Sequence, residues 1–185
     1  MKKNDVYKRE VLNAFQKVSP SKVGIENKQV FQKYLNNHIN LFNNLNFPTE
    51  LFKDKKILDF GCGTGEVDII VAFFGGHVKG FDFNQKSISR ANQLKKFFKL
   101  DKRLSFSCED VDRFEFLKGE YDIAMSHGVI AHVPEQEKMF SKMSNSIREG
   151  GFVILGYIEE AGLFQRLLHR EIIYCNKEKS DKEIM

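Results

Sequence analysis

The chain has 185 residues and a formal net charge of +4, with 42% hydrophobic and 29% charged residues. These fractions are those of a globular protein and argue against a disordered or membrane-embedded chain. No stretch reaches the roughly 18 apolar residues of a membrane span, and no signal-peptide pattern follows the N-terminus. We therefore expect a soluble, cytoplasmic protein.

The cysteines and lysines exclude two further classes. Cys62, Cys108 and Cys175 stand far apart, without the paired spacing of a zinc site or a disulfide framework, so we expect no metal. Most lysines alternate with acids in helical patterns, as in residues 135–138, which is typical of a solvated helix face. A nucleic-acid partner would require a denser basic stripe with interleaved aromatics, and none is expected.

The first fifty residues predict two amphipathic helices, at residues 6–17 and 25–45. We interpret residues 1–50 as a helical lid or cap segment. A core domain at residues 51–175 and a frayed tail at 176–185 follow.

From Lys56 onward, short apolar runs alternate with helical periods, which predicts βαβ units and a parallel sheet. Gly75-Gly76 and Gly150-Gly151 are expected at helix C-caps with positive φ, and Asn84 and Pro134 at helix starts. The predicted strands are residues 57–60, 77–81, 104–108, 121–126 and 152–157. The predicted helices are residues 66–74, 85–100, 134–148 and 161–174, with a short turn near 112–117.

A glycine-rich turn follows the first predicted strand. Gly61, Gly63 and Gly65 lead directly into a helix, so the backbone can approach a ligand closely and the helix N-terminus offers free amides. Asp82 ends the second strand about 20 residues later, where an acid can accept both ribose hydroxyl hydrogens. The pattern predicts a nucleotide-like ligand. The alternatives are a plain strand-to-helix turn for the glycines and a helix N-cap for Asp82.

The spacing of the glycines separates two ligand classes. NAD-binding turns read Gly-x-Gly-x-x-Gly, whereas this turn reads Gly-x-Gly-x-Gly and is followed by Glu66, whose charge would oppose a pyrophosphate. A sulfonium ligand without phosphate avoids that conflict. An NAD-dependent oxidoreductase is therefore the less favoured alternative.

Residues 57–65 resemble motif I of the class I S-adenosylmethionine-dependent methyltransferases. The resemblance extends over residues 52–157 and includes a ribose-binding strand end at 80–84, an adenine-binding turn at 108–111, and the fourth and fifth strands. It implies an α/β, Rossmann-like three-layer sandwich with a mostly parallel sheet in the order 3-2-1-4-5. The family's C-terminal hairpin has no counterpart here.

The same resemblance implies a set of S-adenosylmethionine-binding residues. The glycines would border the methionine and ribose portions, an acid at the first strand would orient the amino group, and an acid at the second would hold the ribose. Phe83 would cover adenine, while Asp110 and the Val111 amide would read its edge; a turn-forming role is the alternative for Asp110. The candidate set is Asp59, Gly61, Cys62, Gly63, Gly65, Asp82, Phe83, Asp110, Val111 and Ser126.

Two histidines after the fourth strand are candidate general bases. His127 and His132 lie where open α/β sheets place ligands, and their ordinary pKa range suits proton removal. The alternatives are a cofactor-lining contact for His127 and a loop-supporting hydrogen bond for His132.

Absent motifs narrow the methyl acceptor. No Asn-Pro-Pro-Tyr or Asp-Pro-Pro-Tyr follows the fourth strand, which argues against adenine N6 or glutamine amide chemistry. No cysteine there follows a proline, which argues against C5 chemistry through a thiolate. We expect a small-molecule acceptor, with a non-catalytic or incomplete cofactor-binding fragment as the alternative.

The sequence after Tyr157 contains no alternating apolar run that predicts another strand. We therefore expect the fifth strand to be an exposed edge and the chain to be the N-terminal portion of a longer protein. Such an edge is open to pairing, for example in a homodimer.

Overall fold

The structure is a computed structural model that describes residues 3–17 and 23–156. The predicted helix at 161–174 and the predicted tail at 176–185 lie outside the described residues. In chain order the elements are α1 (Lys3–Lys17), α2 (Lys28–Asn44), η1 (Thr49–Phe52), β1 (Lys56–Phe60), α3 (Glu66–Phe73), β2 (His77–Asp82), α4 (Gln85–Phe97), β3 (Leu104–Cys108), β4 (Tyr121–His127), η2 (Ile130–His132), α5 (Gln136–Ser146) and β5 (Ile147–Gly156).

The strands form one five-stranded sheet in the order β3-β2-β1-β4-β5, with every neighbouring pair parallel. This confirms the predicted strand order. Because all strands run in the same direction, the turns after β1, β2, β3 and β4 lie together at the carboxyl ends of the strands.

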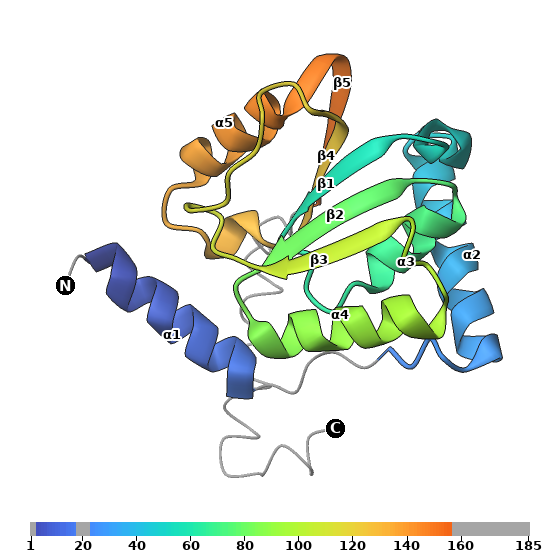
Figure 1. Cartoon of the computed structure of the whole chain (residues 1–185), viewed down its shortest axis with the longest axis horizontal. Helices are drawn as coiled ribbons and strands as arrows, with labels where there is room; N and C mark the ends of the chain where they lie inside the picture. Colours follow the sequence, from blue (N-terminus) through green and yellow to red (C-terminus); the bar gives the residue numbers. More distant parts are fainter. Residues whose placement is uncertain (1–2, 18–22, 157–185) are drawn as a thin grey trace, which may run out of the picture.

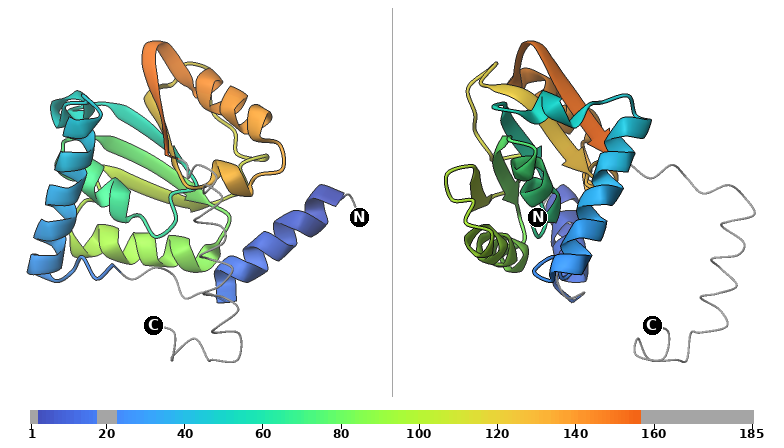
Figure 2. Two further views of the ribbon diagram at one scale, coloured as in Figure 1. Left: turned by 180° about the vertical axis from the view of Figure 1, so that it is seen from behind. Right: turned by 90° about the vertical axis from the view of Figure 1, so that its right-hand side faces the viewer.

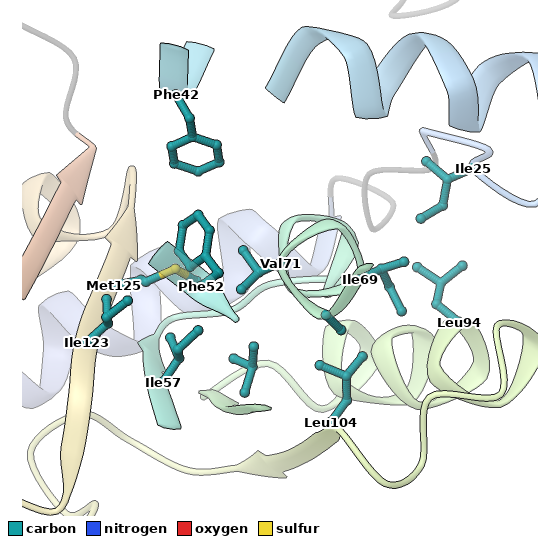
Figure 3. Packing of buried hydrophobic residues seen from close by; sticks show 12 residues of the cluster. Ile25, Phe42, Phe52, Ile57, Ile69, Val71, Leu94, Leu104, Ile123 and Met125 are labelled. Atoms are coloured by element: carbon teal, nitrogen blue, oxygen red, sulfur yellow. The ribbon is translucent and has the colours of Figure 1, made fainter. Parts of the chain in front are cut away.

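Helices cover both faces of this sheet. The helices α2, α3 and α4 lie on one face and α5 on the other (Figures 1 and 2). Successive side chains of β1 point to opposite faces of the sheet. Ile57 belongs to the core cluster that contains Phe42, Phe52 and Ile69 (Figure 3). Leu58 belongs to the cluster on the other face, which includes Met139. The layers are those of a three-layer α/β sandwich.

The two N-terminal helices have different surroundings. Phe42 of α2 is buried in the core cluster beside Phe52, so α2 is part of the packed domain. The helix α1 lies beyond the carboxyl ends of the strands (Figure 1), where Lys8 contacts the turn after β3. Of the two described N-terminal helices, α1 is the one that lies at the carboxyl ends of the strands.

The last α/β unit differs from the prediction. The helix α5 ends at Ser146 and β5 begins at Ile147, so Gly150-Gly151 lie within a strand and do not cap a helix. The pairing of β4 with β5 shifts register between Tyr121 and Ile123, and a Cβ on Gly151 would lie 2.6 Å from the carbonyl oxygen of Asp122. Gly151 permits this close strand contact, and Gly150 has a positive φ of 75° at the irregularity.

Other element ends also differ in detail. Asn27 caps α2, which begins three residues later than predicted, because its side chain accepts from the Gln29 and Val30 amides. Pro134 precedes the N-cap of α5, Glu135, and the segment near 112–117 forms no helix. Gly75 has the expected positive φ of 95°, whereas Gly76 does not.

The described part of the chain contains no helix that is long and apolar enough to cross a membrane. Within the same residues, β5 pairs with β4 alone and ends the sheet.

Candidate functional site

A cavity of about 240 Å³ opens at the carboxyl ends of β1, β2, β3 and β4 and is bordered on one side by α1. The strand-end turns supply most of its wall. Its lining residues are Lys8, Val11, Phe15, Gly61, Gly63, Phe81, Asp82, Phe83, Asn84, Ser87, Glu109, Asp110, Val111, His127, Gly128, Val129, His132, Val133 and Pro134.

The three glycines after β1 have different roles. All have positive φ, but a Cβ on Gly65 would lie 2.9 Å from Ala91 Cβ of α4, so Gly65 permits helix packing. A Cβ on Gly61 would lie 2.4 Å from Val129 Cγ2. At Gly63 no atom lies within 4 Å of the same position, so this residue faces open space beside the cavity.

Asp82 joins the glycine turn to the start of α4. Its Oδ2 accepts the Gly63 amide at 3.1 Å and its Oδ1 accepts the Asn84 amide at 2.8 Å. Asn84 itself caps α4 by accepting the Lys86 amide, so Asp82 is not needed as the helix cap. Burial raises the pKa of Asp82, and the two amides oppose that rise.

The turn after β3 is tied to α1 and to α5. Lys8 of α1 donates to both carboxylate oxygens of Asp110, at 3.0 and 2.9 Å, and also contacts Asp112. Lys142 of α5 donates to the carbonyl oxygens of Val111 and Asp112. The Asp112 amide donates to Asp110 Oδ1 at 2.9 Å, so Asp110 also forms the turn that was its alternative role.

The two histidines stand in different environments. His127 ends β4 and is half-buried, and its Nε2 is buried without a hydrogen-bond partner among the described residues. Burial lowers the pKa of His127, with a smaller contribution from His38 of α2. His132 is exposed and lies edge-on to Phe15 of α1, with ring centroids 5.3 Å apart.

The structure brings most of the predicted residues together at the cavity: Gly61, Gly63, Asp82, Phe83, Asp110, Val111, His127 and His132 all line it. Four predicted residues do not line it. The Ser126 hydroxyl donates to the Phe60 carbonyl oxygen at 2.9 Å, Cys62 packs against Gly80, and Gly65 packs against Ala91. Asp59 is 3% exposed and lies beneath the glycine turn.

The sequence predicted a helical lid within residues 1–50, but it did not predict which residues of α1 line the cavity. Lys8, Val11 and Phe15 line the cavity, and their spacing of three and four residues places them on one helix face. That spacing was visible in the sequence, but nothing there indicated which surface the face would meet. The described residues hold no cluster of His, Cys, Asp and Glu that could bind a metal ion.

Comparisons with known proteins identify the family. Residues 51–183 match the family model described as a methyltransferase domain. This match covers more than half of the chain, so the chain belongs to that family, and its Rossmann-like sheet is that of the class I enzymes.

Individual relatives agree with this assignment. The chain is 28% identical over 134 residues to phosphoethanolamine N-methyltransferase 2 of Caenorhabditis elegans, covering 69% of this chain and 30% of that protein. It is 30% identical over 107 residues to norajmaline N-methyltransferase of Rauvolfia serpentina, covering 57% of this chain and 37% of that protein. The chain thus spans less than half the length of these relatives.

A solved structure shows the same fold. Phosphoethanolamine N-methyltransferase 1 of Haemonchus contortus, in complex with phosphoethanolamine and S-adenosylhomocysteine, superposes with a TM-score of 0.66 at 14% identity. The match covers 83% of this chain and 33% of that one.

Proposed function

We propose that the chain is an S-adenosylmethionine-dependent methyltransferase domain that acts on a small-molecule acceptor. The observation that carries the proposal is the convergence of Asp82, the open face of Gly63 and His127 on one cavity at the carboxyl ends of the strands. Relatives named for methyl transfer to phosphoethanolamine and norajmaline support an acceptor of this size.

The lining of the cavity fits S-adenosylmethionine in shape and charge. The space beside Gly63 is open and holds no side chain of the residue itself, so a ligand can approach the backbone there. Asp82 uses each oxygen for one amide, and each oxygen keeps a lone pair for a ribose hydroxyl. Glu109 adds further negative charge, which favours a cation over a phosphate, whereas the charge of Asp110 is balanced by Lys8.

The adenine end is formed by the turn after β3. Phe83 offers an aromatic face for stacking, and Asp110 can accept from an exocyclic amine. Because Lys142 fixes the carbonyl oxygen of Val111, the Val111 amide is held in place for the adenine edge.

The bound cofactor supplies an activated methyl group, and the protein's part is to align the acceptor and, where needed, to take its proton. We propose His127 as the base. Its lowered pKa keeps the imidazole neutral at neutral pH, and the residue lines the cavity. His132 is the second candidate, at the rim of the cavity beside Phe15.

We propose α1 as the lid of this site. It is held over the cavity by Lys8 on Asp110, by Phe15 on His132 and by a 3.3 Å hydrogen bond from Lys86 Nζ to the Gln16 carbonyl oxygen. Two of the three contacts are polar and can be replaced by contacts with water when the helix moves. The proposed lid is therefore able to open for exchange of cofactor and acceptor.

Calorimetric titration with S-adenosylmethionine, S-adenosylhomocysteine and NAD tests the proposal. We expect both sulfur compounds to bind and NAD to fail, because Glu66 is buried at the N-terminus of α3, where an NAD pyrophosphate would lie. Binding of NAD alone would contradict the proposal. Cofactor binding without turnover on any amine or hydroxyl acceptor would favour a non-catalytic or incomplete fragment.

The proposal extends to the compartment and the partners of the protein. We propose a cytoplasmic domain with no nucleic-acid partner that pairs with a second copy through the open edge of β5. Among the described residues β5 pairs with β4 alone, and Phe152 of β5 is 48% exposed, which supports an edge that accepts a partner. Light scattering tests the pairing, since a monodisperse monomer at high concentration would contradict it.

A further inference from the structure

The cavity has two parts of different chemistry. The turns after β1, β2 and β3 carry the polar groups proposed for the cofactor. The other part is formed by the turn after β4 and by the helix α1, which lies beyond the carboxyl ends of the strands (Figure 1). The side chains that line this second part are mostly apolar: Val11, Phe15, Val129, Val133 and Pro134, with His127 and His132 beside them.

The face of α1 that borders the cavity is only partly covered. The ring of Phe15 lies edge-on to His132, with ring centroids 5.3 Å apart, yet 46% of Phe15 is exposed. Val11 lies one helical turn earlier on the same face and is half-buried. Apolar side chains exposed at a concave surface are typical of ligand sites, because a ligand that covers them removes apolar area from water.

The one lysine on the cavity wall is already engaged. Among the described lining residues, Lys8 alone is a lysine or arginine, and its ammonium pairs with Asp110 and Asp112. The side chain of Lys8 is only 22% exposed within this arrangement. A phosphate or carboxylate on the acceptor would have to compete with two carboxylates for this cation.

The other charged groups on the wall also oppose an anion. Asp82 and Glu109 add negative charge to the cavity. His127 does not offset this charge near neutral pH, because burial and, to a smaller extent, His38 of α2 lower its pKa. An anionic acceptor would therefore lose its hydration without gaining a compensating partner among these residues.

We infer that the acceptor of this site is an apolar molecule without phosphate or carboxylate groups, and that Val11 and Phe15 of α1 select it. The inference rests on the proposed function. Its two supports are independent, since the apolar face of α1 provides the contact area and the charges on the wall exclude anions. Phosphoethanolamine, a phosphate ester, is accordingly not expected to bind.

Naphthol and naphthoate, substituted at the same ring position, test the inference because they differ mainly in charge. Naphthol is neutral near neutral pH, and naphthoate is an anion. Each is titrated by fluorescence into the protein saturated with S-adenosylhomocysteine; the chain contains no Trp that would interfere. We expect naphthol to bind about tenfold or more tightly than naphthoate, and phosphoethanolamine to leave naphthol in place.

A truncation on α1 tests the contact area. Phe15→Ala should weaken naphthol binding by about threefold to tenfold, since part of the apolar area is lost, and should change the affinity for S-adenosylhomocysteine less. Tyr7→Ala is the matched control. Tyr7 is another aromatic residue of α1, is 40% exposed and does not line the cavity, so its loss should leave naphthol binding unchanged.

An added charge on the same helix tests the exclusion of anions. Val11→Lys places a cation on the cavity wall, so naphthoate should bind about threefold or more tightly and naphthol more weakly. Asn13→Lys adds the same charge at an exposed position of α1 that does not line the cavity, and it should keep the wild-type preference. Melting curves show whether each variant folds.

The possible results separate two failures. If S-adenosylhomocysteine does not bind, the proposed function fails. If it binds while naphthol does not bind, binds no better than naphthoate or is displaced by phosphoethanolamine, the apolar acceptor is overturned and the proposed function stands. Unchanged naphthol binding in folded Phe15→Ala also overturns the inference. If Phe15→Ala does not fold, the preference of the wild-type protein and its change in Val11→Lys decide the outcome.

Discussion

The carboxylate of Asp82 accepts the backbone amide of Gly63 at 3.1 Å, across 19 residues of sequence. The contact fixes the tip of β2 against the turn after β1, which are neighbours because β1 and β2 pair in parallel. A single side chain thus sets the shape of the glycine turn and offers its remaining lone pairs to the cavity.

Replacement of Asp82 should weaken cofactor binding. We expect Asp82→Ala to reduce the affinity for S-adenosylhomocysteine by about 2 kcal/mol or more, because two charge-assisted hydrogen bonds to the ribose are lost and the turn loosens. Calorimetry measures the loss. Asp101→Ala, an exposed acid at the opposite end of β3, is the control and should bind normally. Equal affinity of Asp82→Ala and the wild-type protein would remove Asp82 from the site.

Two glycines of one turn should respond differently to the same substitution. Gly63→Val should abolish cofactor binding and leave the fold largely intact, since the new side chain enters open space beside the cavity. Gly65→Val should destabilise the protein by about 1–3 kcal/mol, because its Cβ meets Ala91 at 2.9 Å. Melting temperature and calorimetry separate the two effects. A Gly63→Val protein that unfolds would instead support a purely structural turn.

The contact between α1 and the turn after β3 should control opening of the lid. Lys8→Met keeps the apolar stem but removes the ion pair with Asp110, so we expect faster amide exchange in α1 and faster release of S-adenosylhomocysteine. The closed position of α1 should lose about 1 kcal/mol of stability or less in this variant, as for other part-exposed ion pairs. Lys102→Met, before β3 at the far end of the sheet, is the control. Unchanged exchange in α1 would contradict the lid.

Ionisation of Asp59 should make the unliganded protein pH-sensitive. Burial raises the pKa of Asp59 to about 7, so the folded state keeps a proton that the unfolded chain loses at much lower pH. Stability should therefore fall as the pH rises from about 5 to about 7, by at most about 1.4 kcal/mol per unit, and then level off.

Denaturation of the wild-type protein and Asp59→Asn over this range measures the effect. His127, whose pKa is lowered, contributes with the opposite sign, but it is present in both proteins and cancels in the difference. Parallel pH curves for the two proteins would show that Asp59 is already ionised near pH 5.

The two histidines should differ in turnover. With any acceptor that loses a proton, we expect His127→Asn to lower kcat by about a hundredfold or more, because a neutral base inside the cavity is lost. His132→Asn should have a much smaller effect, since His132 is exposed and contacts Phe15. Rates within a factor of about two for both variants would leave alignment alone as the protein's contribution.

The sheet and the cofactor turn were predictable because their signals are local. The apolar run before Gly61 and the acid at Asp82 indicate strand ends by themselves, and the parallel order follows from the βαβ pattern. The start of β5 was not predictable, because Gly150-Gly151 have the composition of a helix end. The strand is revealed by the pairing of β5 with β4 and by the close approach of Gly151 to Asp122.

The candidate site was predicted in part for the same reason. Asp82, Phe83 and Asp110 lie at strand ends, so their position in the chain fixes their place in the cavity. Cys62 and Ser126 are equally near strand ends, yet the side chain of each turns into the protein, which depends on packing. The burial of Asp68 depends on how α3 packs, and its helical position in the sequence does not reveal it.

The residues that match the family model begin at residue 51, whereas α1 ends at Lys17. One wall of the cavity thus comes from outside the segment that defines the family. Mutations at Val11 or Phe15 can change what enters the cavity while Asp82 and the glycine turn stay as they are. In the proposed methyltransferase, substitutions on this one surface helix can therefore alter which acceptor enters while the proposed cofactor site is kept.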